Sequence, residues 1–173
     1  PEDQPEALAK DWVDVGFGLA GSGGRAINVE KLLTKKLVAV IPEGHRLADR
    51  SEITLQDLAG ERLVSIAQRA ASGFVHRQND LFLREGLTPT VVQEAPDPQV
   101  QLALVAAGVG PGLHLASIRK AVRHRGVVFI PLAPDPPSVT LTLLWRRDDD
   151  RELLRLFLET AREVARSASW PGR

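Results

Sequence analysis

Residues 93–113 read QEAPDPQVQLALVAAGVGPGL, and this stretch decides the fold. Asp97 can accept hydrogen bonds from the free backbone N–H groups of a first helical turn, and Pro98 suits the first helical position because its missing N–H has no partner there. Apolar residues then recur at helical spacing until Gly108, which can adopt the left-handed conformation that ends a helix. The next residues have almost no polar side chain until His114. The stretch therefore predicts a capped helix and a buried return strand, at a turn where α/β sheets bind small molecules.

Strands and helices alternate on both sides of this stretch. Their hydrophobic periodicity and their glycine and proline boundaries are typical of an α/β fold with a mostly parallel sheet. Residues 29–33 fit either a short strand or a helical turn, residues 68–73 are expected to form a loop, and residues 167–173 a frayed tail. Strands are expected at residues 12–17, 36–42, 62–66, 89–93, 127–132 and 139–145. Residues 4–10 are expected to be the end of a helix, and Thr54 is expected to cap a short one. Further helices are expected at residues 74–85, 118–123 and about 151–165.

Composition limits the classes of protein that the chain can belong to. Its 173 residues suffice for one large or two small domains, and 43% hydrophobic and 25% charged residues are ordinary for a globular protein. A formal net charge of zero argues against a nucleic-acid-binding module, which would need a basic surface. No apolar run approaches the ~20 residues of a membrane span, so no membrane contact is expected. The absence of cysteine excludes disulfides and thiol chemistry and leaves cytoplasm and periplasm open.

No motif for catalysis, a metal or a cofactor stands out. Residues 16–21 match the dinucleotide pattern G-x-G-x-x-G, but the following Ser-Gly-Gly is poor helix material, so a flexible loop facing the ligand crevice is expected instead. The four histidines form no close metal-binding pair, and the G-x-S-x-G elbow of a serine nucleophile is absent. We therefore expect no catalytic residues, no metal and no cofactor. Residues 146–150, two arginines followed by three aspartates, are expected to form a solvated loop and a helix cap.

A candidate anion site follows the strand expected at residues 62–66. Ser72, Gly73 and Phe74 are expected to open a helix, whose exposed N–H groups could hold an anion while Phe74 forms an apolar wall. Ordinary capping by Ser72, with Phe74 as a core residue, explains the same residues. Helix chemistry alone does not separate these two interpretations.

Five pieces of the chain occur in an order and spacing known from one family. They are WVDVGFG at 12–18, LVAVIPEGHRLA at 37–48, LQDLAGE at 55–61, EGLTP at 85–89 and QVQLALVAAGVG at 99–110. Together they resemble the effector-binding domain of LysR-type transcriptional regulators, over nearly the whole chain to about residue 165.

The resemblance implies a fold with two subdomains. It predicts two Rossmann-like α/β subdomains joined by crossing strands, as in type 2 periplasmic binding proteins. Subdomain I would comprise residues 1–34 and 137–166, and subdomain II residues 35–136, with the proline-rich segment 133–138 at the second crossing. Relative to the family, the chain is expected to lack the first strand and most of the first helix of subdomain I, and also the winged helix-turn-helix domain.

The resemblance also implies a function. The domain would bind a small effector, a carboxylate or similar anion, between the subdomains. It would transmit the binding signal to DNA only through the missing N-terminal domain. It would act in the cytoplasm as a homodimer or homotetramer, with the 74–85 helix expected at the interface, and it would have no enzymatic activity. A periplasmic solute-binding protein of a transporter is the alternative, and a small α/β enzyme is a third possibility that lacks a candidate nucleophile.

The expected effector site combines residues from both subdomains. Leu19 stands where members that sense products of aromatic degradation often have arginine, and Leu33 stands at a second such position. His114 would give the pocket an unusual polar group, and Asp97 matches a position that is acidic in some members. The effector-binding residues implied by the resemblance are Phe17, Gly18, Leu19, Ser72, Gly73, Phe74, Asp97 and His114.

Overall fold

The computed structural model describes residues 4–19, 24, 26–121 and 125–167, without the side chains of residues 68–72, 120 and 121. The helices are α1 (Gln4–Ala9), α2 (Leu55–Ala59), α3 (Gln68–Arg84), α4 (Pro98–Ala106), α5 (Ile118–Ala121) and α6 (Glu152–Ser167). The strands are β1 (Val15–Leu19), β2 (Ile27–Pro42), β3 (Arg62–Ile66), β4 (Thr90–Ala95), β5 (Gly112–Leu115), β6 (Val127–Pro131) and β7 (Ser138–Arg146).

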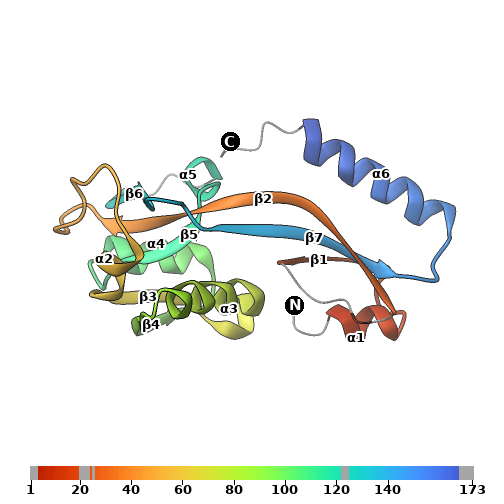
Figure 1. The fold of residues 1–173 in the computed structure, drawn as a ribbon, viewed down its shortest axis with the longest axis horizontal. Helices are drawn as coiled ribbons and strands as arrows, with labels where there is room; N and C mark the ends of the chain where they lie inside the picture. Colours follow the sequence, from red (N-terminus) through yellow and green to blue (C-terminus); the bar gives the residue numbers. More distant parts are fainter. Residues whose placement is uncertain (1–3, 20–23, 25, 122–124, 168–173) are drawn as a thin grey trace.

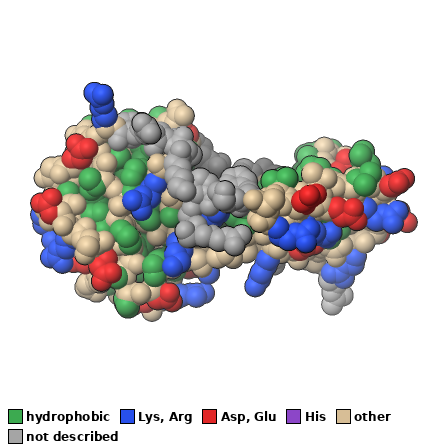
Figure 2. Space-filling view, turned by 90° about the horizontal axis from the view of Figure 1, so that it is seen from above, with side chains coloured by type: hydrophobic (Ala, Val, Ile, Leu, Met, Phe, Trp, Pro, Cys, Tyr) green, Lys and Arg blue, Asp and Glu red, His purple; other side chains and the backbone are tan. Residues whose placement is uncertain are grey.

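The molecule is elongated and has a broad and a narrow lobe (Figure 1). The broad lobe contains α2 to α5 with β3 to β6, and the narrow lobe contains α1, β1 and α6, while β2 and β7 extend between them (Figure 1). Seen from above, acidic and basic side chains are intermixed over the visible face, as the zero net charge leads one to expect (Figure 2). None of the described helices is both long and apolar enough to cross a membrane.

The strand β2 connects the two lobes. Its first part pairs antiparallel with β7, from Ile27 opposite Arg146 to Lys36 opposite Ser138. From Leu37 onward β2 pairs with β5, and from Val38 also with β6, again antiparallel. The segments expected separately at residues 29–33 and 36–42 are therefore one strand of 16 residues.

The expectation of a mostly parallel sheet is wrong. Every pairing of the five-stranded sheet is antiparallel, and among the described strands only β3 and β4 form a parallel ladder. The strand β7, from the far end of the chain, lies between β1 and β2 in the sheet, and β2 takes β5 and β6 as its other antiparallel partners. Alternation along the sequence gives the order of the elements but does not reveal such a long-range insertion.

The predicted caps of α2 and α4 are confirmed. Asp97 Oδ1 accepts from the backbone N–H groups of Gln99 at 2.8 Å and Val100 at 3.0 Å, at the start of α4. Thr54 caps α2 in a reciprocal arrangement with Asp57. Gly108 follows the end of α4 with φ +80°, the left-handed conformation expected there.

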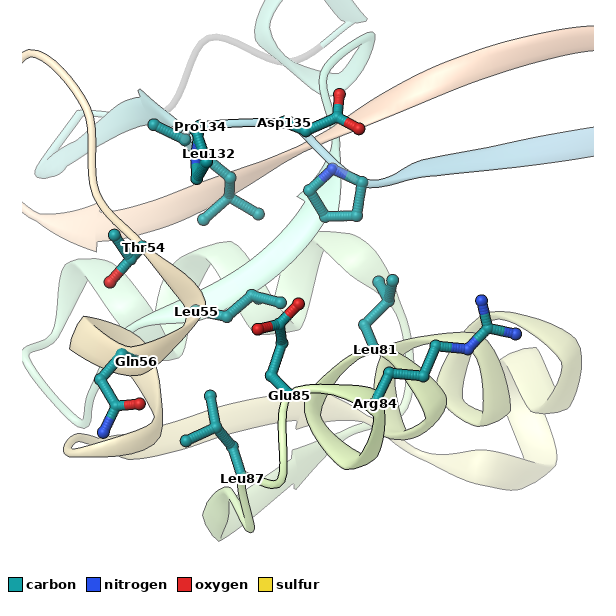
Figure 3. A pocket seen from close by; sticks show the side chains of 12 residues that line it. Thr54, Leu55, Gln56, Leu81, Arg84, Glu85, Leu87, Leu132, Pro134 and Asp135 are labelled. Carbon is teal, nitrogen blue, oxygen red and sulfur yellow. The ribbon is translucent and has the colours of Figure 1, made fainter.

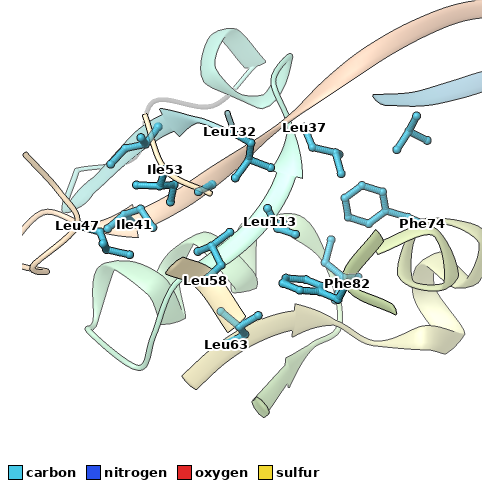
Figure 4. Close-up of a cluster of buried hydrophobic side chains, with 14 residues drawn as sticks. Leu37, Ile41, Leu47, Ile53, Leu58, Leu63, Phe74, Phe82, Leu113 and Leu132 are labelled. Atoms are coloured by element: carbon cyan, nitrogen blue, oxygen red, sulfur yellow. The ribbon is translucent and has the colours of Figure 1, made fainter. Parts of the chain in front are cut away.

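The main core lies in the broad lobe, where helices pack against the inner part of β2 (Figure 4). Leu37 and Ile41 of β2 are fully buried and share this cluster with Phe82 of α3 and Leu113 of β5. A second cluster joins Val40 of β2, on the other face of the strand, to α4. Burial of both faces explains why this half of β2 reads as an unbroken apolar run.

The glycine-rich segment 108–112, which returns the chain from α4 to β5, lies directly against β3. The backbone N–H of Val64 donates to Pro111 O at 2.8 Å. A Cβ on Gly110 would lie 1.8 Å from Arg62 O, so only glycine allows the two chain segments to approach this closely. Gln101 of α4, fully buried, donates from Nε2 to Val64 O at 2.9 Å and fixes the helix to the same strand.

An ionic network holds the loop between β7 and α6. The expectation of a solvated loop is therefore wrong for Arg146 and Asp149. The Arg146 side chain is 14% exposed and lies within 3.1 Å of Asp11 and within 3.0 Å of Asp14 and Asp149. Arg151 also binds Asp149, with Nε 2.8 Å from Oδ1. The network joins the loop before β1 to the start of α6. It was missed because Asp11 and Asp14 are far from residue 146 in the sequence.

The close approach at Gly110 predicts a large loss of stability on adding a methyl group. G110A should lower the free energy of unfolding in urea by about 3 kcal/mol, because β3 or the return must move. G44A is the matched control, since a Cβ on Gly44 has no atom within 4 Å. Equal stabilities of the two variants would contradict the contact.

The network predicts a pH-dependent contribution from Asp149. The hydrogen bond from Arg151, together with Arg146, lowers the pKa of Asp149 from 3.8 to about 2. Because the folded pKa is depressed, this contribution is present above pH 4 and is lost as the pH falls toward 2. D149N should destabilise the domain by about 2 kcal/mol in urea unfolding at pH 7, and the difference from wild type should shrink below pH 4. D148N, at an exposed position, should change neither the free energy of unfolding at pH 7 nor its dependence on pH.

Candidate functional site

The start of α3 differs from the sequence-based expectation. The helix begins at Gln68, after Ala67, which makes no side-chain cap. Residues 68–73 are therefore helical, Gly73 and Phe74 lie in the second turn, and Ser72 does not cap the helix. The Ser72 side chain lies outside the described part of the chain. The small and polar residues that indicated a loop are compatible with a helix because tertiary context overrides weak helix propensity.

The starts of α3 and α4 lie side by side. They follow the carboxyl ends of the parallel strands β3 and β4, and the Ala67 N–H donates to Ala95 O at 2.8 Å. Carboxyl ends of neighbouring parallel strands are where α/β proteins bind ligands. Asp97 is exposed here, but its Oδ1 accepts both N–H groups of the α4 cap. Its first role is therefore to fix α4.

The two lobes meet where Leu19 ends β1. A Cβ placed on Gly73 would lie 3.3 Å from the backbone oxygen of Leu19. Leu19 also packs against the main core cluster, which includes Phe74. The structure thus brings Leu19, Gly73 and Phe74 together from distant parts of the sequence.

His114 adds a polar group beside Phe74. The two ring centroids are 5.7 Å apart, and both residues are buried, with 7% and 4% of their surfaces exposed. His114 Nδ1 accepts from the backbone N–H of Leu115 at 2.8 Å, while Nε2 has no partner among the described residues. Burial lowers the pKa of His114, which keeps the ring neutral near pH 7.

Phe17 and Gly18 lie farther along β1 and face other elements. The Phe17 ring is 46% exposed and packs edge-on against Phe157 of α6, with centroids 6.4 Å apart. Gly18 leaves room for Leu144, whose Cδ1 would be 2.9 Å from a Cβ at this position. The backbone oxygen of Gly18 accepts from Thr142 Oγ1 at 3.2 Å.

Sequence reasoning missed Arg77 as a neighbour of this site. It lies three residues after Phe74 on α3, so the two side chains emerge from neighbouring positions on the helix surface. Its Nε atom is buried and has no partner among the described atoms. Its position three residues after Phe74 in an expected helix could have indicated that the two side chains are neighbours.

A hollow of about 460 Å³ lies away from Phe74, between the segment after β6 and the facing ends of α2 and α3 (Figure 3). Leu55, Leu81 and Leu132 line it, and Glu85 and Asp135 are among its charged residues. Both carboxylates are exposed, and none of the expected effector-binding residues takes part. This hollow is therefore separate from the site around Phe74.

The chemistry of the site around Phe74 is suited to binding. It offers an aromatic wall, a neutral histidine whose Nε2 has no partner among the described residues, and the uncapped start of α3. Within the described residues, no group of three or more His, Asp and Glu could hold a metal ion.

Known proteins are similar to this chain in both sequence and fold. A family model for the LysR substrate binding domain matches residues 1–166. The regulator CatR of Pseudomonas putida is 33% identical over 147 residues, which are 85% of this chain and 50% of CatR. BenM of Acinetobacter baylyi is 27% identical over 164 residues, which are 93% of this chain and 53% of BenM. The chain spans about half the length of these curated relatives.

Solved structures agree with the sequence relatives. The effector-binding domain of a BenM variant superposes with a TM-score of 0.86 at 25% identity, covering 99% of this chain and 81% of that chain. The BenM effector-binding domain with its effector benzoate gives a TM-score of 0.82, also at 25% identity, and covers 94% and 74% of the two chains. These neighbours confirm the α/β fold of the periplasmic-binding-protein type. With residues 1–166 matched by the family model, the chain belongs to the LysR substrate binding domain family.

Proposed function

We propose that the chain senses a small anionic metabolite and passes the signal to the DNA-binding domain of a longer LysR-type regulator. The match of residues 1–166 to the LysR substrate binding domain carries this proposal. The relatives described above are transcriptional regulators, which favours regulation over the alternative of solute transport. DNA would be contacted only through the N-terminal domain, in the cytoplasm.

The effector would bind where the two lobes meet. We take residues 1–34 with 137–166 as subdomain I and residues 35–136 as subdomain II. The change of β2 partners after Lys36 supports this division, because there the strand leaves β7 and enters the sheet of the broad lobe. The approach of Gly73 to Leu19 supports a site between the subdomains.

An anion is favoured by the start of α3 at this place. The first turn of α3 has no side-chain cap, so its N–H groups give the region a positive electrostatic character, whereas those of α4 are taken up by Asp97. Phe74 and Leu19 supply apolar surface, which suits a carboxylate with an apolar body. The solved BenM domain with benzoate shows that one relative takes an effector of this class.

Self-association completes the proposed function. We expect a homodimer or homotetramer that uses α3, whose Leu83 side chain is 66% exposed. An exposed apolar residue on an amphipathic helix is a common component of such interfaces. A species that stays monomeric at high concentration in analytical ultracentrifugation would contradict this part of the proposal.

Benzoate is a practical probe of the effector site. Calorimetric titration should show benzoate binding about 10-fold more tightly than benzyl alcohol, because the carboxylate interacts with the helix N–H groups. F74L should weaken benzoate binding at least about 3-fold by removing the flat aromatic wall, while circular dichroism checks that the domain remains folded. L153A, at an exposed position on α6, is the control. Unchanged affinity in F74L would place the site away from Phe74.

A further inference from the structure

We infer that the Nε2–H group of His114 is a fixed hydrogen-bond donor that selects effectors presenting an acceptor oxygen beside Phe74. The inference rests on the proposed function, because it assigns the chemical class of ligand group that the same proposed site would take. The histidine concerned is the third residue of β5 in this chain.

The hydrogen bond at Nδ1 determines the tautomer of the ring. A backbone N–H can only donate, and that of Leu115 points to His114 Nδ1 at 2.8 Å. Nδ1 must therefore be unprotonated, and a neutral imidazole then carries its hydrogen on Nε2. Burial disfavours the imidazolium form, so the neutral ring with Nε2–H is the form present near pH 7.

Three buried side-chain atoms of the described residues have no hydrogen-bond partner, namely Arg77 Nε, Gln101 Oε1 and His114 Nε2, and of these only His114 Nε2 belongs to a ring in contact with Phe74. Gln78 and Thr142 are also buried, and both donate to backbone oxygens, at 3.1 and 3.2 Å. His114 Nε2 has no such acceptor among the described residues. A buried donor without an acceptor costs free energy, and a ligand oxygen that supplies the acceptor recovers it.

The donor is also held rigidly. His114 lies opposite Val38 in the ladder with β2, and the neighbouring carbonyl of Leu113 accepts from the amides of Gln78 and Gln101, at 3.1 and 3.5 Å. Turning the ring would break the bond to Leu115. A donor fixed before binding discriminates strongly, because a ligand with only N–H groups at this point would leave His114 unpaired.

Phe74 defines what the rest of the ligand must be. Its ring lies 5.7 Å from the imidazole at an interplanar angle of 47°, so a ligand oxygen reaching Nε2 comes close to an aromatic surface. An apolar body with a carboxylate or carbonyl oxygen satisfies both neighbours. A purely polar ion would leave the Phe74 side unfilled.

Two variants at His114 separate the donor from the size of the side chain. H114L removes the donor and should weaken benzoate binding about 10-fold in calorimetric titration at pH 7.5. H114Q keeps an N–H donor near the Nε2 position and should stay within about 3-fold of wild type. H45Q alters a histidine that pairs with Glu61 in the broad lobe, and it should bind as wild type does.

The free protein gives an independent readout. Nitrogen NMR on histidine-labelled protein, with H114Q used for assignment, should show a protonated Nε2 and an unprotonated Nδ1 for His114. An Nδ1–H tautomer, or H114L binding benzoate as tightly as wild type, would overturn the inference and leave the proposed function standing. Wild-type protein that binds no benzoate would instead overturn the proposed function for aromatic carboxylates, and the tautomer would still decide the state of the donor.

Discussion

The antiparallel pairing of β2 with β7 is the constraint on which the rest of the structure depends. The two strands run side by side from Ile27 to Lys36 and form the framework of the narrow lobe, while the second half of β2 is the centre of the broad lobe. Both lobes therefore share one continuous backbone. Near Lys36 this backbone passes from its pairing with β7 to its pairing with β5 and β6, so the place where the lobes join is one stretch of strand.

Close backbone packing then positions the site. The return through Gly110 and Gly112 lies against β3, and the Gln101 amide fixes α4 to the same strand. These contacts hold β5, and with it His114, beside α3. The position of His114 is thus set by backbone approach and by buried amides, whose displacement would leave polar groups unpaired.

Local chemistry in the sequence predicted much of this structure. Asp97, Pro98 and Gly108 correctly marked the limits of α4, because capping depends on neighbouring residues. The parallel sheet and the late start of α3 were wrong, since strand insertion and the stability of residues 68–73 as a helix depend on tertiary contacts. The ring geometry of His114 was likewise beyond reach, because its hydrogen bond and its burial exist only in the assembled fold. The eight effector-binding residues implied by family resemblance stay a prediction.

The contact between Gly73 and Leu19 has a consequence for how such a sensor can be tuned. A side chain at position 73 would come within 3.3 Å of the Leu19 backbone oxygen at the end of β1. The size of the residue at position 73 therefore limits how closely α3 can approach the end of β1. A larger side chain would force these two elements apart by a few tenths of an ångström, and would thus alter the proposed site without replacing Phe74 or His114.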